Sequence, residues 1–439
     1  MTTSSAYHGG ENFDLRDILL KGRTLRLEER TAFFQEFLGS MRERGENSCM
    51  RCINSPADRE VEVVDPATWR RRAMLMFGSN NYLGLATHPY VQKKAQEAIE
   101  EFGIGLGGPP LLNGYTTLHR SLEERLAALK GTEDAMVFSS GYGANVGLVS
   151  GLTSRSDIIV YDAYSHASFC DGVKLSGAQS FLFSHNDTGN LRLILNQAAN
   201  RPHNDLFVGV EGVYSMDGDL APLDRILPLC REYGAHLIVD DAHGTGVMGA
   251  NGRGTGEHFG LEGTIDITMG TFSKAFAVSG GFVAAKKPII DYLRYFARSY
   301  MFSASLPPVV IATVLAGLDV MEREPERAKR LHENIEYAAA ALRRLGFHTP
   351  SESAIIPLRV PPGMDIRKAA KGFHERGIFV NSIEYPAVPI SQQRFRISIM
   401  ATHTREDIDR LVNAVREVWV ETGSEIEEYA NETKQSHAA

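Results

Sequence analysis

Cysteine is scarce in this chain. Among its 439 residues there are four cysteines, namely Cys49, Cys52, Cys170 and Cys230. That number is too small for a disulfide scaffold in a chain of this length, and it fits a reducing compartment such as the cytosol. Cys49 and Cys52 form a lone C-x-x-C with no second pair and no histidine cluster near it, so a zinc or redox role stays open and two incidental thiols are favoured. We therefore expect no metal site.

Long hydrophobic runs and an excess of positive charge are also lacking. The longest apolar stretch, 309–318, is far too short to cross a bilayer, and the polar segment 1–11 has no signal pattern. The formal net charge of -8 argues against broad binding to nucleic acids or anionic membranes. We expect a cytoplasmic protein with no transmembrane segment and no nucleic-acid partner.

What is present is typical of a globular protein with more than one domain. The residues are 43% hydrophobic and 23% charged. The patterns predict an N-terminal arm and connector over 1–73, with an amphipathic helix at 24–44, and a large domain over 74–309. A smaller domain over 310–420 and a flexible tail over 421–439 follow. A long helical segment is expected to begin near residue 310 and to run to Arg343.

Short apolar runs alternate with helical stretches through the large domain. Runs so short and so uninterrupted are typical of strands buried on both faces of a largely parallel sheet, and their alternation with helices predicts an α/β layered domain. These runs are 135–138, 158–161, 206–210, 237–239, 265–269 and 282–285. Further strands at 355–360, 379–381 and 395–399, with a helix at 365–376, predict a smaller C-terminal α/β domain.

Lys274 directly follows the apolar run 265–269 and is flanked by small and hydroxylic residues. A desolvated amine loses part of its proton affinity and can attack a carbonyl to form a Schiff base. By itself an ordinary loop lysine would explain the pattern equally well. The lysine becomes informative because polar segments follow other predicted strands, where open α/β sheets bind their ligands.

Two of these segments have complementary chemistry. The glycine-rich segment 139–145 follows one strand and opens a helix, whose free N–H groups could bind a phosphate. Asp240 and Asp241 end another strand, with His243 close behind. A carboxylate there could bind a protonated ring nitrogen. The alternative for the first segment is a plain glycine turn, and the alternative for the second is that Asp241 or His243 caps the turn.

Three further segments could complete a ligand site. His166 follows the run 158–161 and could stack on a flat cofactor, although a lone histidine is more often structural. Glu211 and Ser215 follow another strand and offer a carboxylate and a hydroxyl. Arg394 and Arg396 are two positions apart in a predicted strand and therefore lie on the same face of it. An arginine fork there could bind a carboxylate or form a surface ion pair.

Taken together, the motifs resemble the α-oxoamine synthase family of pyridoxal-phosphate enzymes, of fold type I. The resemblance runs from about residue 76 to 417 and is carried by SNNYLGL (79–85), SGY (140–142), SHAS (165–168), EGVYSMDGD (211–219), DDAHGTG (240–246), TFSK (271–274) and RIS (396–398). It implies an aminotransferase-like α/β fold. A mostly parallel seven-stranded sheet would lie in a large domain that binds pyridoxal 5'-phosphate, followed by a smaller C-terminal α/β domain.

The resemblance also implies roles for individual residues. Lys274 would hold the cofactor covalently and later remove the α-proton of an amino acid, while Asp240 keeps the ring nitrogen protonated. His243 would bond the ring hydroxyl and His166 would stack on the ring, which makes these four the catalytic residues. The remaining assignments are Gly141, Tyr142, Thr271 and Ser273 for the phosphate, Glu211 and Ser215 for the cofactor pocket, and Arg396 with Asn80 or Asn81 for the substrate carboxylate.

The implied reaction is a decarboxylative Claisen condensation of a small amino acid with an acyl thioester, giving an α-amino ketone. The segments 300–308 and 385–389 are similar to those of the bacterial serine palmitoyltransferase branch, which favours L-serine and a long-chain acyl thioester as substrates and a 3-keto sphingoid base as product. Sister activities are 8-amino-7-oxononanoate synthase and 2-amino-3-ketobutyrate ligase. A non-catalytic partner subunit or a regulator is the alternative of another class, and the presence of all four catalytic residues argues against it.

One segment departs from the family pattern. Pro109 and Pro110 stand where relatives usually have a small or hydroxylic residue and an arginine, and proline donates no N–H. An acyl carrier protein could therefore replace coenzyme A as the carrier of the acyl group. The resemblance further implies a homodimer with the active site at the subunit interface.

Overall fold

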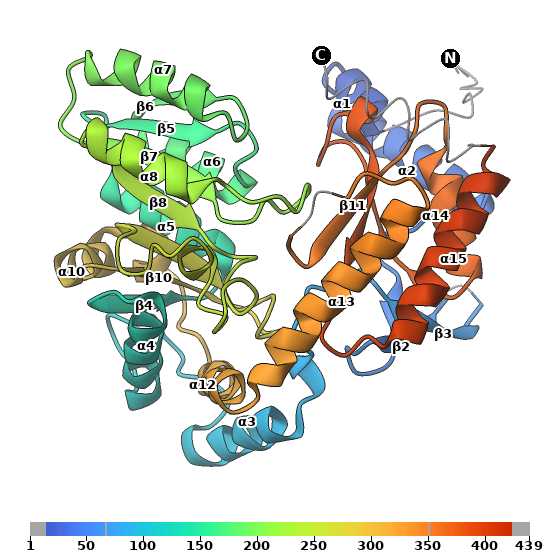
Figure 1. Cartoon of the computed structure of the whole chain (residues 1–439), viewed down its shortest axis with the longest axis horizontal. Helices are drawn as coiled ribbons and strands as arrows, with labels where there is room; N and C mark the ends of the chain where they lie inside the picture. Colours follow the sequence, from blue (N-terminus) through green and yellow to red (C-terminus); the bar gives the residue numbers. More distant parts are fainter. Residues whose placement is uncertain (1–14, 66–67, 350–351, 424–439) are drawn as a thin grey trace.

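The computed structural model describes residues 15–65, 68–349 and 352–423, which form two lobes (Figure 1). The first lobe is built around a seven-stranded sheet, and the second contains two smaller sheets. Two helices, α12 (Pro308–Arg323) and α13 (Pro325–Arg344), lead from the first lobe to the second. A single helical segment was expected here. Pro325 begins a second helix instead, because proline fits the first turn of a helix but not its interior.

The seven-stranded sheet has the order β4-β10-β9-β8-β7-β5-β6. All neighbouring strands are parallel except β10, which is antiparallel to both β4 and β9. The mostly parallel seven-stranded sheet predicted for the large domain is therefore confirmed. Its strands are β4 (Asp134–Phe138), β5 (Ile158–Asp162), β6 (Gln179–Phe183), β7 (Leu206–Glu211), β8 (His236–Asp240), β9 (Ile267–Thr271) and β10 (Gly281–Ala285).

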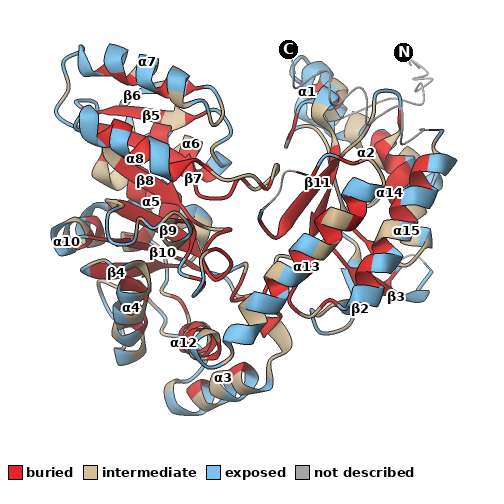
Figure 2. Ribbon diagram, viewed as in Figure 1, coloured by how far each residue is buried: buried red, intermediate tan, exposed pale blue. Residues whose placement is uncertain are grey.

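Helices cover both faces of this sheet, which is why its inner strands are uninterrupted apolar runs. Ile158 and Val160 pack with α7 (Thr188–Ala199) and α8 (Leu223–Glu232) on one face, whereas Ile159 packs with α5, α6 and α10 on the other. The helices of that second face are α5 (Gly141–Leu152), α6 (Ala167–Ser176) and α10 (Lys287–Phe296). Figure 2 shows the buried strands between helices with exposed outer faces.

Strand β6 is the member of the sheet that no apolar run had indicated. It lies at the edge, next to β5, and most of its side chains are not buried. An edge strand needs apolar residues on only part of its surface, so its sequence shows a weaker pattern than a central strand.

The second lobe joins distant parts of the chain. A four-stranded sheet contains β1 (Cys52–Ile53), β2 (Glu60–Val64), β3 (Arg71–Met76) and β12 (Ile378–Phe379), and β3 pairs with β12 in parallel. A three-stranded antiparallel sheet contains β11 (Ile355–Arg359), β14 (Arg394–Ser398) and β13 (Asn381–Ile383). The segment expected to be a connector thus forms a sheet with the C-terminal part of the chain.

The remaining helices pack around these sheets. They are α1 (Leu15–Gly22), α2 (Leu27–Glu43), α3 (Pro89–Phe102), α4 (Thr117–Lys130), α9 (Thr255–His258), α11 (Arg298–Met301), α14 (Ile366–Glu375) and α15 (Arg405–Glu421). None of the helices in the described ranges is long and apolar enough to cross a membrane.

Candidate active site

Lys274 lies just beyond the end of β9, in the loop that leads back to β10. The loop is closed by backbone hydrogen bonds from Phe272 to Gly280 (2.9 Å) and from Val278 to Phe272 (3.0 Å). Burial lowers the pKa of the Lys274 amine, and the negative charge of Asp240 opposes that shift only in part. Within the described ranges the amine makes no hydrogen bond or ion pair. Lys274 is therefore a lysine with weakened proton affinity and an uncommitted nitrogen.

Asp240 ends β8 and belongs to a buried chain of hydrogen bonds. The amide nitrogen of Asn145 donates to the Asp240 carboxylate (2.6 Å) and lies 2.9 Å from the hydroxyl of Ser168, which in turn lies 2.7 Å from Nδ1 of His166. The His166 ring itself stays exposed, so one of its faces is free for a flat ligand. The chain fixes the carboxylate and the imidazole relative to each other.

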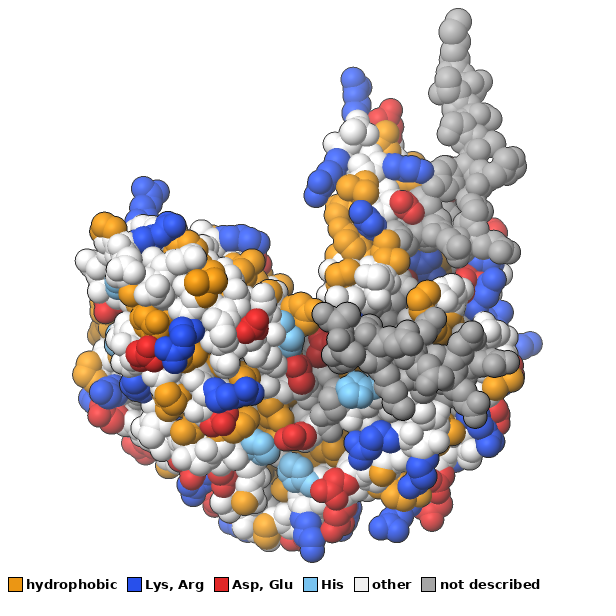
Figure 3. All heavy atoms as spheres, turned by 45° about the horizontal axis from the view of Figure 1, so that its top comes forward, with side chains coloured by type: hydrophobic (Ala, Val, Ile, Leu, Met, Phe, Trp, Pro, Cys, Tyr) orange, Lys and Arg blue, Asp and Glu red, His pale blue; other side chains and the backbone are white. Residues whose placement is uncertain are grey.

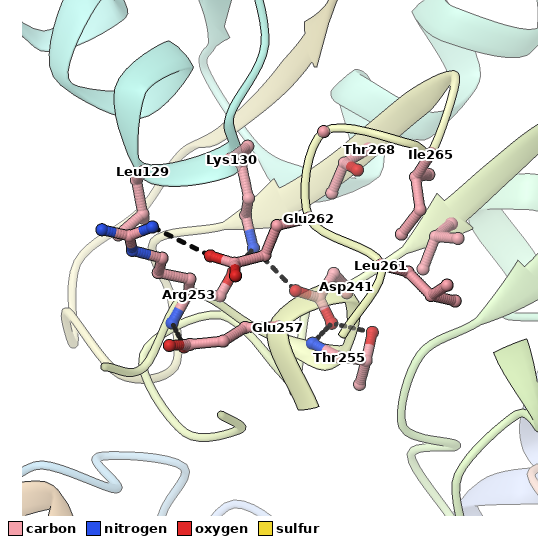
Figure 4. A pocket seen from close by; sticks show the side chains of 13 residues that line it. Leu129, Lys130, Asp241, Arg253, Thr255, Glu257, Leu261, Glu262, Ile265 and Thr268 are labelled. Carbon is pink, nitrogen blue, oxygen red and sulfur yellow. Dashed lines mark hydrogen bonds and ion pairs between the residues drawn. The ribbon is translucent and has the colours of Figure 1, made fainter. Parts of the chain in front are cut away.

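The neighbouring Asp241 points into a different environment. Its carboxylate forms an ion pair with Lys130 (2.7 Å) and accepts a hydrogen bond from the Thr255 hydroxyl (2.7 Å), as Figure 4 shows. The side chains of Lys130 and Asp241 are only 4% and 2% exposed. Because successive side chains leave a strand in opposite directions, Asp240 and Asp241 serve different clusters. The alternative that Asp241 supports the local turn agrees with these contacts.

Glu211 ends β7 and lies directly across from Asp240 in the strand register. One of its oxygens accepts a hydrogen bond from the Ser215 backbone (3.2 Å), while Oε1 is buried with no hydrogen-bond partner. Burial raises the pKa of Glu211 well above its ordinary value, and the charge of Asp240 adds to the shift. The Glu211 carboxyl group, next to Asp240, therefore keeps its proton to a higher pH than an ordinary glutamic acid.

The start of α5 meets the end of β9 at Gly141. A Cβ atom at Gly141 would lie 2.7 Å from the Thr271 hydroxyl oxygen, so only glycine allows this approach. The Thr271 and Ser273 hydroxyls are 3.0 Å apart, and the helix begins with Ser140 as its N-cap. A helix N-terminus flanked by two hydroxyls is an arrangement that can bind a phosphate group.

Tyr142 follows Gly141 at the start of α5. Its ring is 49% exposed and its hydroxyl donates a hydrogen bond to Asp171 on α6. The side chain therefore stabilises the contact between α5 and α6 and does not line the phosphate site.

On the second lobe, Arg396 of β14 faces the segment that follows β3. Its Nη2 donates to the Asn80 side-chain oxygen (3.1 Å) and lies 3.4 Å from the Tyr82 hydroxyl. The Tyr82 hydroxyl is 2.8 Å from Nδ1 of His243. These contacts join the two lobes, and Figure 3 shows the surface hollowed between them, with histidine and acidic side chains along the hollow.

Asn81 and Arg394 have other partners. Asn81 accepts a hydrogen bond from the Leu85 backbone (2.9 Å) and donates one to the Ala57 carbonyl (3.2 Å). Arg394 is fully buried and forms an ion pair with Asp217. Of the two asparagines and two arginines considered for the substrate carboxylate, the structure thus brings Asn80 and Arg396 together.

Sequence reasoning assigned no role to Tyr82, Asn145 or Ser168. Each lies inside a motif that was noted for other residues. Asn145 is one helical turn after Gly141, so the two share a helix face, and that spacing could have indicated its position. Nothing in the local sequence indicates the contact of Tyr82 with His243, because the two residues are 161 positions apart.

The site has polar atoms that a ligand could satisfy. Glu211 Oε1, Asn145 Oδ1 and Arg396 Nε are buried and have no hydrogen-bond partner among the described residues, and such atoms are costly when no ligand satisfies them. The amine, the carboxylate next to it and the phosphate site are the groups that this cofactor requires. The residues therefore fit pyridoxal phosphate, which when bound supplies a ring that accepts electrons from the α-carbon of an amino acid.

Comparison with known proteins agrees with this fit. Residues 72–415 match the family model "Aminotransferase class I and II". The 8-amino-7-oxononanoate synthase of Geotalea daltonii is 42% identical over 388 residues, covering 88% of this chain and 97% of that protein. The serine palmitoyltransferase of Bacteriovorax stolpii is 41% identical over 359 residues, covering 82% and 85% of the two chains.

A third relative is larger than this protein. The 4-hydroxy-2,2'-bipyrrole-5-methanol synthase PigH of a Serratia species is 42% identical over 358 residues, and this chain spans about half of its length (54%). Among solved structures, a serine palmitoyltransferase from S. paucimobilis superposes with a TM-score of 0.84 at 32% identity, covering 91% of this chain and all of the other (100%). The chain thus belongs to the aminotransferase class I and II family and, within it, to the α-oxoamine synthases, which are acyltransferases that depend on pyridoxal phosphate.

Proposed function

We propose that this enzyme condenses L-serine with a long-chain acyl thioester to give a 3-ketodihydrosphingosine-type α-amino ketone. A carbon–carbon bond forms between the α-carbon of serine and the acyl carbonyl carbon. The thiol leaves with its carrier, and the serine carboxylate leaves as CO₂. The observation that carries the proposal is the Arg396–Asn80 pair, which offers a carboxylate site close enough to the Lys274 amine for the Arg396 charge to lower the pKa of that amine.

Residues of the chain have a role in each step of the reaction. Arg396 binds the carboxylate of the amino acid as a fixed, permanently charged donor, with Asn80 orienting the guanidinium. Lys274, with its lowered pKa, takes the α-proton. Asp240, held by Asn145, would bind the protonated ring nitrogen of the cofactor, and His166 would stack on the ring.

Two observations support the serine branch over its sister activities. The superposition with a serine palmitoyltransferase has a TM-score of 0.84, whereas that with an 8-amino-7-oxononanoate synthase of Francisella tularensis has a TM-score of 0.67. The segments 300–308 and 385–389 are also similar to that branch. The second candidate is 8-amino-7-oxononanoate synthesis, which is favoured by the match over 97% of the Geotalea daltonii enzyme.

Mass spectrometry of the product from mixed substrates tests the proposal. The enzyme is given equal concentrations of serine, alanine and glycine with palmitoyl, pimeloyl and acetyl thioesters, each carried by coenzyme A or by an acyl carrier protein. The expected main product is the ketone derived from serine and the palmitoyl group. A main product derived from alanine and the pimeloyl group would replace the leading assignment by the second candidate.

We also propose that the enzyme is a homodimer and that it is located in the cytoplasm. Ile104, Leu112 and Phe302 are 78%, 81% and 69% exposed, and the segments that carry them are joined by a hydrogen bond from Ser305 to Gly108 (3.1 Å). Pro109 and Pro110 lie in the same region. Exposed apolar groups of this size support an interface there. Light scattering should give twice the mass of the 48.4 kDa chain, and the monomer mass would remove this part of the proposal.

A further inference from the structure

The Tyr82 hydroxyl stands at the centre of the substrate side of the site. Tyr82 is fully buried in the turn between β3 and the short 3-10 helix Leu85–Thr87. Its oxygen lies 2.8 Å from His243 Nδ1, 3.2 Å from the Asn80 side-chain oxygen and 3.4 Å from Arg396 Nη2. Each of these three partners is a residue to which cofactor or substrate binding is assigned.

The donors and acceptors in this cluster can be allotted one by one. Arg396 has only donors, so its Nη2 donates to Asn80 and, more weakly, to the Tyr82 oxygen. The single proton of Tyr82 can go to the Asn80 oxygen, at 3.2 Å, or to His243 Nδ1, at 2.8 Å, and the shorter contact favours His243 as its acceptor. Burial raises the pKa of Tyr82 to about 12, so that proton is retained at neutral pH.

His243 can accept this hydrogen bond because it is neutral. Burial and the charges of Lys274 and Arg396 hold its pKa well below the ordinary value. A neutral imidazole carries one proton, and a ring that accepts at Nδ1 carries that proton on Nε2. The direction of the hydrogen bonds is therefore from Arg396 through Tyr82 to His243.

We propose that Tyr82 is a positioning residue that fixes the Nε2–H tautomer of His243 and connects it to the carboxylate site at Arg396. Nε2–H is then a permanent donor toward the cofactor. A carboxylate that draws the Arg396 guanidinium to itself weakens the contact of Arg396 with Tyr82, so binding of the amino acid changes the hydrogen bond that His243 receives. This second statement rests on the proposed function, because it requires an amino-acid substrate at Arg396.

The tautomer is tested directly in the cofactor-free protein. Histidine nitrogen NMR, with the His243 signals assigned from the spectrum of His243→Asn, should show Nδ1 without a proton and Nε2 with one. In Tyr82→Phe the Nδ1 signal should lose the shift caused by its hydrogen bond. A proton on Nδ1 in the natural protein would overturn the proposal even if Tyr82→Phe failed to fold.

Cofactor binding gives an independent measurement. Loss of one buried hydrogen bond should weaken pyridoxal phosphate binding of Tyr82→Phe about threefold to tenfold, followed by absorbance. The matched control is Tyr90→Phe, which removes the 2.7 Å hydrogen bond of a hydroxyl to Asp319, remote from the site. Equal cofactor affinity in Tyr82→Phe and the natural protein would contradict the positioning role.

The coupling between the substrate and His243 is measured by comparing the natural protein with Tyr82→Phe. Addition of serine should move the His243 Nδ1 signal of the cofactor-loaded natural protein and leave that of Tyr82→Phe unmoved. If both signals move equally, the connection through Tyr82 is wrong. If the tautomer is as expected but no amino acid gives a product, the proposed function fails and the tautomer assignment stands.

Discussion

Two buried polar clusters meet at the end of β8, and they differ in whether the protein itself pairs their groups. In the Lys130 cluster, defined as Lys130, Asp241 and Thr255, each charge has a partner at 2.7 Å. In the Lys274 site, defined as Lys274, Asp240, Glu211, Asn145 and Arg396, the described contacts leave Glu211 Oε1, Asn145 Oδ1 and Arg396 Nε without partners.

The difference separates stabilisation from ligand binding. Buried polar groups that are all paired stabilise a fold, whereas several unpaired ones gathered around a lysine amine can receive their missing partners from a ligand. Asp240 and Asp241 are adjacent in sequence and equally buried, at 5% and 1% exposure. Only the direction of the side chain decides to which cluster each belongs.

The largest effect is expected from Lys274→Ala. The variant should lose about 10³-fold or more of its acyltransferase activity, because it lacks both the covalent anchor for the cofactor and the base. Its cofactor-free form should unfold at the same temperature as the natural protein or higher, since the substitution removes a buried amine without a partner. Initial rates and thermal unfolding check both statements, and a marked loss of stability would mean that Lys274 is structural.

Lys130→Ala should give the opposite result. Removal of the amine leaves Asp241 buried and unpaired, so the free energy of unfolding should fall by roughly 3–5 kcal/mol in urea titrations. Activity per folded molecule should change little. The control is Lys287→Ala, which breaks the exposed 2.9 Å pair with Asp291 and should change the free energy of unfolding far less than Lys130→Ala does. Equal effects of the two variants would refute the structural role of the Lys130 cluster.

His185→Gln tests the stabilisation by paired buried groups through its dependence on pH. His185 bridges Asp162 (3.0 Å) and Asp219 (2.9 Å), in the two loops that carry His166 and Ser215. Burial lowers its pKa, but the hydrogen bonds to the two carboxylates outweigh this effect and raise the pKa to about 9. Since the folded-state pKa lies above the unfolded value of 6.5, the stabilisation is complete below pH 6.5 and is lost as the pH rises through 9.

At pH 7 the difference in free energy of unfolding between His185→Gln and the natural protein should be about 2 kcal/mol. Urea titrations from pH 6 to pH 10 measure it. A difference that stays constant over this range would show that His185 acts by packing alone, for instance through its stacking on Tyr164.

The smallest effect is expected from Glu211→Gln. Burial and the charge of Asp240 raise the pKa of Glu211 and so favour its protonated form, and an uncharged amide of the same shape should therefore change the dissociation constant of pyridoxal phosphate less than about threefold. Glu211→Leu, which removes both polar atoms, should have a larger effect. Absorbance titrations compare the variants, and a tenfold or greater loss in Glu211→Gln would mean that Glu211 is ionised in the site.

The sequence predicted the central strands because burial on both faces leaves an unmistakable apolar run. It did not predict β6, whose exposed edge position relaxes that requirement, or the pairing of β3 with β12, which joins residues about 300 positions apart. The break before α13 depends on one residue, Pro325, inside an otherwise helical pattern. Local patterns thus determine the elements, and long-range pairing has to be seen in the structure.

For the site, the motifs gave the residue types but not their partners. Asp240 and Asp241 are equivalent in the sequence, and only the contact with Lys130 separates them. Asn80 and Asn81 are distinguished in the same way, because the amide of Asn81 is used by the backbone of Leu85 and Ala57. Tyr82 was missed because its importance lies in a contact with a distant residue.

Borohydride reduction of the protein with pyridoxal phosphate, followed by digestion and mass spectrometry of the peptides, tests the central claim most directly. Lys130 is paired with Asp241, whereas the Lys274 amine, whose pKa burial lowers, has no hydrogen bond or ion pair within the described part of the chain. The pyridoxyl mass should appear on the peptide that contains Lys274 and not on the one that contains Lys130. A label on Lys130, or no label on Lys274, would contradict the account.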